Sequence, residues 1–202
     1  MKALIWKDTY VIWRQMKYFL VMLLLFCSLP NGFNNAFAVI YAAMLPYTAL
    51  AYDERSKWDQ LAATMPYSTR DMVLSKYVFG WLCIIGAAAL SGLLQTAASF
   101  VTHRAFLPSV LALSALGAVC ILAITLPLMF RFGVERGRLA MFLVIFLVCG
   151  AAAAIAKLAE EMSGGALSIL SGSMVALALL VAAVLTVVSV PLSMGFYGRR
   201  QR

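Results

Sequence analysis

The sequence predicts an all-α, polytopic membrane protein with six transmembrane helices. Of its 202 residues, 64% are hydrophobic and 12% are charged, whereas soluble domains carry about 25% charged residues. The chain has six apolar runs, and all but the first approach or exceed the roughly 20 residues that a spanning helix needs. They cover residues 18–30, 33–52, 77–101, 108–130, 139–156 and 166–195. The whole chain, residues 1–202, is therefore expected to form one transmembrane domain.

The N-terminal segment 1–17 has the pattern of an amphipathic helix. Its apolar face carries Ile5, Ile12 and Met16, with Trp6 and Trp13 at the edges of that face. The opposite face carries two cations, Lys7 and Arg14. This arrangement favours a helix that lies in the membrane interface; a downward extension of the first span is the alternative. The first apolar run is short, so it either borrows residues from this segment or forms a shallow hairpin with the second run, turning at residues 30–32.

Basic residues gather on alternate connections between the apolar runs. The N-terminal segment and residues 53–76 carry four Lys or Arg each, and residues 131–138 and the tail carry three each, which makes 14 of the 16. The positive-inside rule then places both termini and both polar segments on the cytoplasmic side of the membrane. Although the net charge is +8, the cations lie between apolar runs, so no nucleic-acid partner is expected.

The most informative segment is the polar insert 53–76, DERSKWDQLAATMPYSTRDMVLSK. At helical spacing it presents an apolar ridge made of Trp58, Leu61, Ala62 and Met65. The polar side chains that lie away from this ridge are Asp53, Lys57, Asp59 and Gln60. Pro66 ends this predicted helix, and Ser68–Asp71 has the S-x-x-D form of a capping box for the next span. The ridge suits docking into a protein groove; a connector resting on lipid headgroups is the alternative.

Residue patterns for catalysis, metal binding or nucleotide binding do not occur in the chain. The phosphate-loop, H-E-x-x-H and G-x-S-x-G motifs are all missing. The cysteines lie inside apolar runs without metal-ligand spacing (Cys27, Cys83, Cys120 and Cys149). No acidic or basic residue lies well inside a predicted span, which argues against an ion-coupled transporter. We therefore expect no catalytic residue, metal or cofactor on this chain.

Three segments resemble the small ABC-2-type transporter permeases. Residues 52–77, with the acidic-aromatic opening, the Met-Pro turn and the Lys-Tyr pair, are similar to the first cytoplasmic loop of that family. The start MKALIWKD and the R-F-G and R-G-R groups of residues 131–138 resemble its N-terminus and second cytoplasmic loop. Within the family, the resemblance is to permease subunits of phenol-soluble-modulin-type peptide exporters.

The resemblance implies an exporter of amphipathic peptides or lipophilic cargo in a bacterial plasma (inner) membrane, driven by separate ATPase subunits. Two such subunits would carry ATP and Mg, and a second permease copy would complete the pathway, as a homodimer or, alternatively, a heterodimer. The resemblance assigns the ATPase-coupling role to the insert, with Trp58 as an apolar anchor; the residues are Asp53, Glu54, Lys57, Trp58, Leu61, Met65 and Arg70. It assigns a second cytoplasmic contact to residues 131–138, through Arg131, Gly133 and Arg136. A non-transporting membrane scaffold and a membrane-embedded enzyme are the alternatives from other classes.

Overall fold

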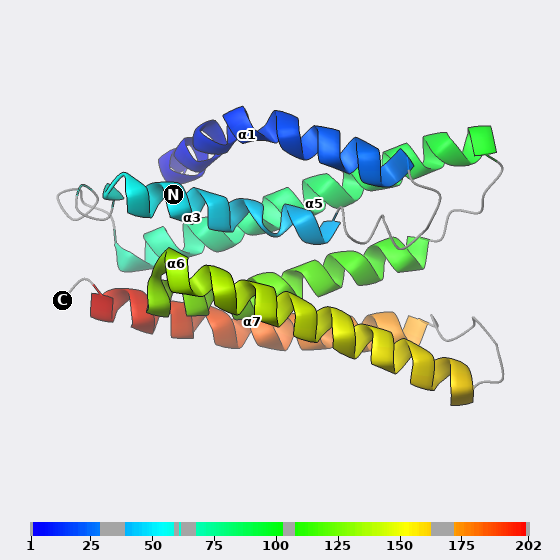
Figure 1. The fold of residues 1–202 in the computed structure, drawn as a ribbon. Coiled ribbons are helices and arrows are strands. Elements are labelled where there is room, and N and C mark those ends of the chain that lie inside the picture. The colour runs from blue at the N-terminus through cyan, green and yellow to red at the C-terminus, as the bar shows by residue number, and fades with distance from the viewer. Residues whose placement is uncertain are drawn as a thin grey trace.

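The computed structural model describes residues 2–28, 39–58, 61, 68–102, 108–162 and 172–200. Its helices, labelled in Figure 1, are α1 (Lys2–Ser28), α3 (Leu45–Arg55), α5 (Thr69–Thr102), α6 (Pro108–Met162) and α7 (Gly172–Arg200). No strand occurs among these residues. The prediction of an all-α chain is confirmed for the part that is described.

The helices run lengthwise in one bundle. In Figure 1, α1 and α3 lie with α5 on one side, and α6 and α7 lie together on the other. The start of α1, the end of α3, the start of α5, the bend of α6 and the end of α7 share one end of the bundle (Figure 1). This end collects the connections that the count of basic residues grouped together. That it faces the cytoplasm stays a prediction.

The helix α6 is a hairpin of two helical arms. Gly133 has φ 79° and ψ 173°, and helical residues flank it on both sides. This backbone conformation is available almost only to glycine, and Figure 1 shows the chain reversing there. The predicted second loop, residues 131–138, is therefore much tighter than expected: only its glycine leaves the helical conformation. Gly137 lets the arms approach, since a Cβ there would lie 2.8 Å from Met129 Cγ.

The second apolar run contains a break and then the helix α3. The chain turns at residues 43–44, and Pro46 lies in the first turn of α3, where its missing N–H costs nothing. At the other end, the backbone N–H of Ser56 donates to the Tyr52 carbonyl at 2.9 Å, and Lys57 has a positive φ of 53°. The predicted insert helix is therefore wrong at its start: residues 53 and 54 form the last turn of α3, and the break follows at residues 56–57.

Two further predictions concern the N-terminal helix and the cap at the start of α5. α1 is continuous from Lys2 to Ser28, so residues 2–17 continue directly into the first apolar run. That residues 1–17 lie in the membrane interface stays a prediction. The buried face of α1 carries Leu4, Asp8 and Ile12, and Trp6 and Trp13 are exposed. The predicted cap of α5 is confirmed, because the Asp71 backbone N–H donates to Ser68 Oγ at 3.3 Å.

Within the described part of the chain, three helical segments are long and apolar enough to cross a membrane: Thr69–Ala97, Leu111–Val148 and Ala178–Gly198. The second of these contains the reversal at Gly133. Between the helices, the largest core cluster is apolar and joins α3, α5 and both arms of α6 to α7, with Val73, Leu122, Leu126 and Tyr197 among its buried residues. A multi-pass membrane protein is thus supported, and the count of six spans stays a prediction.

Candidate functional site

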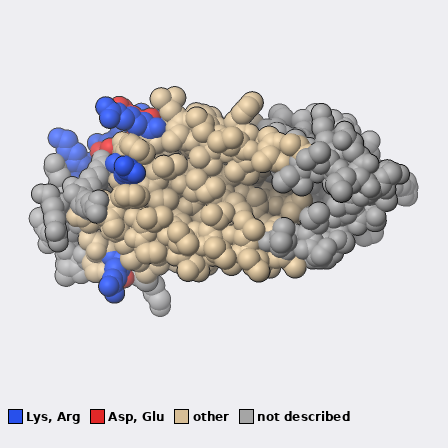
Figure 2. Space-filling view, turned by 90° about the horizontal axis from the view of Figure 1, so that it is seen from below, with Lys and Arg blue, Asp and Glu red and all other residues tan. Residues whose placement is uncertain are grey.

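Charged side chains gather at one end of the bundle. Figure 2 shows Lys, Arg, Asp and Glu side chains at the end where the termini lie, and none on the described middle part of the face in view. This end is formed by the start of α1, the α3–α5 region and the bend of α6 (Figure 1). We call it the charged end. Because the described middle part of this face shows no charged side chain, the charged end is the part of the described surface best suited to a water-soluble partner.

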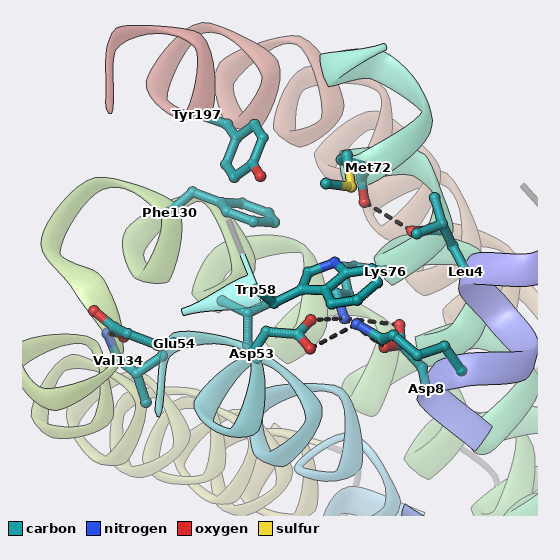
Figure 3. A pocket seen from close by; sticks show the side chains of 13 residues that line it. Leu4, Asp8, Asp53, Glu54, Trp58, Met72, Lys76, Phe130, Val134 and Tyr197 are labelled. Atoms are coloured by element: carbon teal, nitrogen blue, oxygen red, sulfur yellow. Dashed lines mark hydrogen bonds and ion pairs between the residues drawn. The ribbon is translucent and has the colours of Figure 1, made fainter. Parts of the chain in front are cut away.

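Four charged residues from three helices form a closed network at the charged end. Lys76 of α5 donates to both carboxylate oxygens of Asp8, on α1, at 2.7 and 2.8 Å, and to Asp53, on α3, at 2.6 Å. Lys7 pairs with the other oxygen of Asp53 at 2.6 Å and with Asp8 at 3.2 Å. We call these residues the ion cluster; Figure 3 shows its contacts.

The ion cluster is shielded from water and electrically balanced. The side chain of Asp8 is 1% exposed, and those of Lys76 and Asp53 are 10% and 13% exposed. Burying charges is costly unless they are paired and hydrogen-bonded, and here two cations face two anions. The Trp58 ring covers Lys7, whose Nζ lies 4.4 Å from the ring centroid, a cation–π distance. The cluster therefore ties α1, α3 and α5 together at this end.

A cavity of about 30 Å³ adjoins the ion cluster. Trp58, Met72 and Phe130 supply apolar lining (Figure 3), and the cluster supplies the polar part. Phe130 also meets Tyr197 of α7 edge to face, at 5.5 Å between ring centroids. The space has room for a few water molecules at most and is too small for a peptide.

Glu54, the residue after Asp53, makes a long-range contact outside the ion cluster. A carboxylate oxygen of Glu54 accepts the backbone N–H of Val134 at 2.7 Å. Val134 follows Gly133 and begins the second arm of α6, so its N–H is one that a helix start leaves without an intrahelical partner. A carboxylate at that position is further favoured by the helix dipole. Glu54 therefore caps the hairpin of α6 from α3.

Beside Glu54 the surface is hollowed. The hollow has a volume of about 550 Å³ and lies between α3 and the bend of α6. Three arginines, two glutamates and Phe132 are among its lining residues (Arg55, Arg136 and Arg138; Glu54 and Glu135). It is the larger of the two cavities described at the charged end, and both adjoin the end of α3.

The predicted site residues fall into two groups. Asp53, Glu54 and Trp58 point into the protein and hold its helices together. Others are exposed at the charged end (Lys57, Leu61, Arg70, Arg131 and Arg136), with the Arg131 guanidinium over the rings of Phe132 and Phe196 at 5.2 and 5.3 Å. Gly133 forms the bend. Met65 lies outside the described residues, as do Asp59, Gln60 and Pro66.

Sequence reasoning missed Lys7, Asp8 and Lys76 as members of one cluster. A signal was present for one of them: Asp8 lies four residues from both Leu4 and Ile12, so it interrupts an otherwise apolar helix face. A charged residue on such a face requires a partner. Its partner Lys76 is 68 residues away, and no local pattern identifies it.

Comparisons with known proteins gave one match. A family model described as ABC-2 family transporter protein matches residues 3–198. No curated protein and no solved structure matches the chain significantly. The family match spans the ion cluster, the hairpin of α6 and nearly all of the described helices. The chain therefore belongs to the ABC-2 family of transporter proteins, and it is a permease subunit of an ABC transporter.

Proposed function

We propose that this permease exports amphipathic peptides or lipophilic cargo, and that a separate ABC ATPase drives it through residues 53–76. The observation that carries the proposal is the ion pair between the two ends of that segment. Asp53 is its first residue and Lys76 its last, and their side chains meet at 2.6 Å. The segment is thereby closed at its base and fixed to α1 through Asp8 and Lys7.

Because its two ends are joined, the segment 53–76 is suited to transmit motion from an ATPase to the helices. Displacement of its exposed part would move α3, α5 and α1 together, because strong short contacts join them. Transport by an ATPase requires such a transfer of motion between rigid elements. Leu61 is 52% exposed and remains accessible, whereas Trp58 covers Lys7. Leu61 is therefore the better candidate for a residue that an ATPase groove would receive, together with Lys57 and Arg70.

The chemistry of the helices supports the proposed cargo. Away from the charged end, the buried polar residues of the described helices are hydroxyl-bearing (Ser91, Ser114, Thr125, Thr186, Ser189 and Ser193). Helices whose described buried polar groups are hydroxyls suit an apolar or amphipathic cargo, but they offer a strongly charged solute no compensation for its lost hydration. A pair of permeases, as a homodimer, would enclose the path, with two ATPase subunits supplying ATP and Mg.

Vesicles that contain the permease and its ABC ATPase test this function. A fluorescently labelled amphipathic helical peptide should accumulate inside inverted vesicles only while ATP is hydrolysed. Leu61→Ala should weaken ATPase co-purification and transport about 10-fold, as removal of one interface anchor does. Leu93→Ala, an equally conservative change at a residue 68% exposed on α5, is the control. ATP-independent uptake driven by a proton or sodium gradient would refute the proposal, and so would unchanged binding in Leu61→Ala.

A further inference from the structure

Two neighbouring acidic residues at the end of α3 contact opposite parts of the bundle. Asp53 and Glu54 are adjacent in its last turn, and consecutive helix residues point about 100° apart. Figure 3 shows their carboxylates directed to different neighbours. One turn of helix therefore reaches two groups of helices at once.

The Asp53 side of this turn fastens the N-terminal helices. Its two oxygens pair with Lys7 of α1 and Lys76 of α5, each at 2.6 Å. Lys76 also holds Asp8 of α1. Motion of α3 along its axis would therefore displace both partners, because each contact is charge-assisted and largely shielded from water.

The Glu54 side fastens the hairpin of α6. Its carboxylate accepts the Val134 backbone N–H at 2.7 Å, across 80 residues of sequence. Gly133, next to Val134, is the residue at which the hairpin bends. A force on Glu54 therefore acts at the corner between two helical arms, and the second arm continues into the part of α6 that packs with α7.

We propose that Asp53 and Glu54 are positioning residues that divide the movement of residues 53–76 between the N-terminal helices and the α6–α7 pair. This inference rests on the proposed ATPase coupling and assigns these two carboxylates a role inside the permease rather than at the ATPase surface. Without the Glu54 contact, the ATPase would still bind and hydrolyse ATP, but its movement would reach α6 and α7 only through the apolar core, so these helices would follow α1, α3 and α5 less closely.

The hydrogen bond of Glu54 can be removed and restored separately. Glu54→Ala removes the acceptor for Val134 N–H, whereas Glu54→Gln keeps a carbonyl oxygen that can accept the same bond. Glu135→Ala is the matched control, because Glu135 is an exposed carboxylate on the residue after Val134. Each variant is purified as the complex with its ABC ATPase and assayed in vesicles for ATP hydrolysis and for transport of the labelled peptide.

We expect Glu54→Ala to lower the peptide transported per ATP hydrolysed about 10-fold, within the range of measured couplings between sites. ATPase co-purification should stay at the wild-type level, and Glu54→Gln and Glu135→Ala should transport nearly normally. If Glu54→Ala loses ATPase binding together with transport, Glu54 is a contact residue and the inference is wrong. If the transport ratio is unchanged, the contact transmits nothing and the inference is equally wrong.

A distance measurement separates this inference from the proposed function. Spin labels at Val78 of α5 and Leu139 of the second α6 arm, both exposed, report how the two groups of helices move when ATP binds. In the wild-type complex the distance between the labels should take one value in each state, and Glu54→Ala should broaden it in the ATP-bound state. An identical distribution in both proteins refutes the division of movement. Failure of the wild-type complex to form would instead refute the proposed coupling.

Discussion

Replacing Lys76 by methionine tests how the ion cluster holds the charged end together. Methionine keeps the unbranched apolar stem but removes the ammonium group. Lys76 Nζ lies 2.6 Å from Asp53 and 2.7 Å from Asp8. The substitution leaves two carboxylates facing the single cation of Lys7, and one of them, on Asp8, is almost fully buried.

The expected loss of stability follows from these distances. At about 2.7 Å, two unit charges attract by roughly 6 kcal/mol at an effective dielectric constant of about 20. Much of the gain from the two contacts of Lys76 is offset by desolvation, which costs several kcal/mol per ion. Removing one partner of a buried pair typically costs about 3–5 kcal/mol, because a charge is left uncompensated. We expect Lys76→Met to lower the free energy of unfolding by that amount.

The measurement is reversible unfolding of the detergent-solubilised protein by titration with SDS, followed by circular dichroism. Arg70→Met is the control: it removes an exposed cation of the same helix and should change stability by less than about 0.5 kcal/mol. Combining Lys76→Met with Asp8→Asn removes one charge of each sign and should recover about 2 kcal/mol relative to the sum of the single changes. A loss below about 1 kcal/mol in Lys76→Met, or strict additivity in the double variant, would refute the reasoning.

Three further substitutions test the hairpin of α6 and the start of α5. Gly133→Ala should lower the free energy of unfolding by about 1–3 kcal/mol, because φ 79° and ψ 173° suit only glycine. Gly137→Ala should cost about 1–3 kcal/mol, since its Cβ would lie 3.1 Å from Met129 Cα. Gly150→Ala, with nothing within 4 Å of its Cβ, is the control for both and should be neutral or slightly stabilising. Ser68→Ala removes the cap of α5 and should cost about 1 kcal/mol. SDS titration measures all four, and wild-type stability in Gly133→Ala would contradict the bend.

Local patterns were sufficient to predict several elements. The cap at Ser68 depends on groups a few residues apart, so residue type alone indicates it. The division of the basic residues correctly grouped the connections that share the charged end. The interfacial position predicted for residues 1–17 stays a prediction; the structure shows one helix over Lys2–Ser28 whose Asp8 face is buried against the bundle.

Long-range contacts at the charged end were not predictable in the same way. Asp53 and Glu54 were expected on a surface helix because both are charged and lie in a polar insert. In the structure they end α3 and reach Lys76 and Val134, which are 23 and 80 residues away. A buried carboxylate needs a partner, but its residue type does not identify which residue the fold places next to it.

The sequence by itself determined that this chain is helical, belongs in a membrane and concentrates its charge on alternate connections, because hydrophobicity, helix signals and charge are properties of neighbouring residues. Only the tertiary structure decided that the charges at the base of the polar insert neutralise one another and that Glu54 caps the bend of α6. Those outcomes depend on the packing of helices distant in sequence, where low water access makes each pairing strong and each missing partner costly.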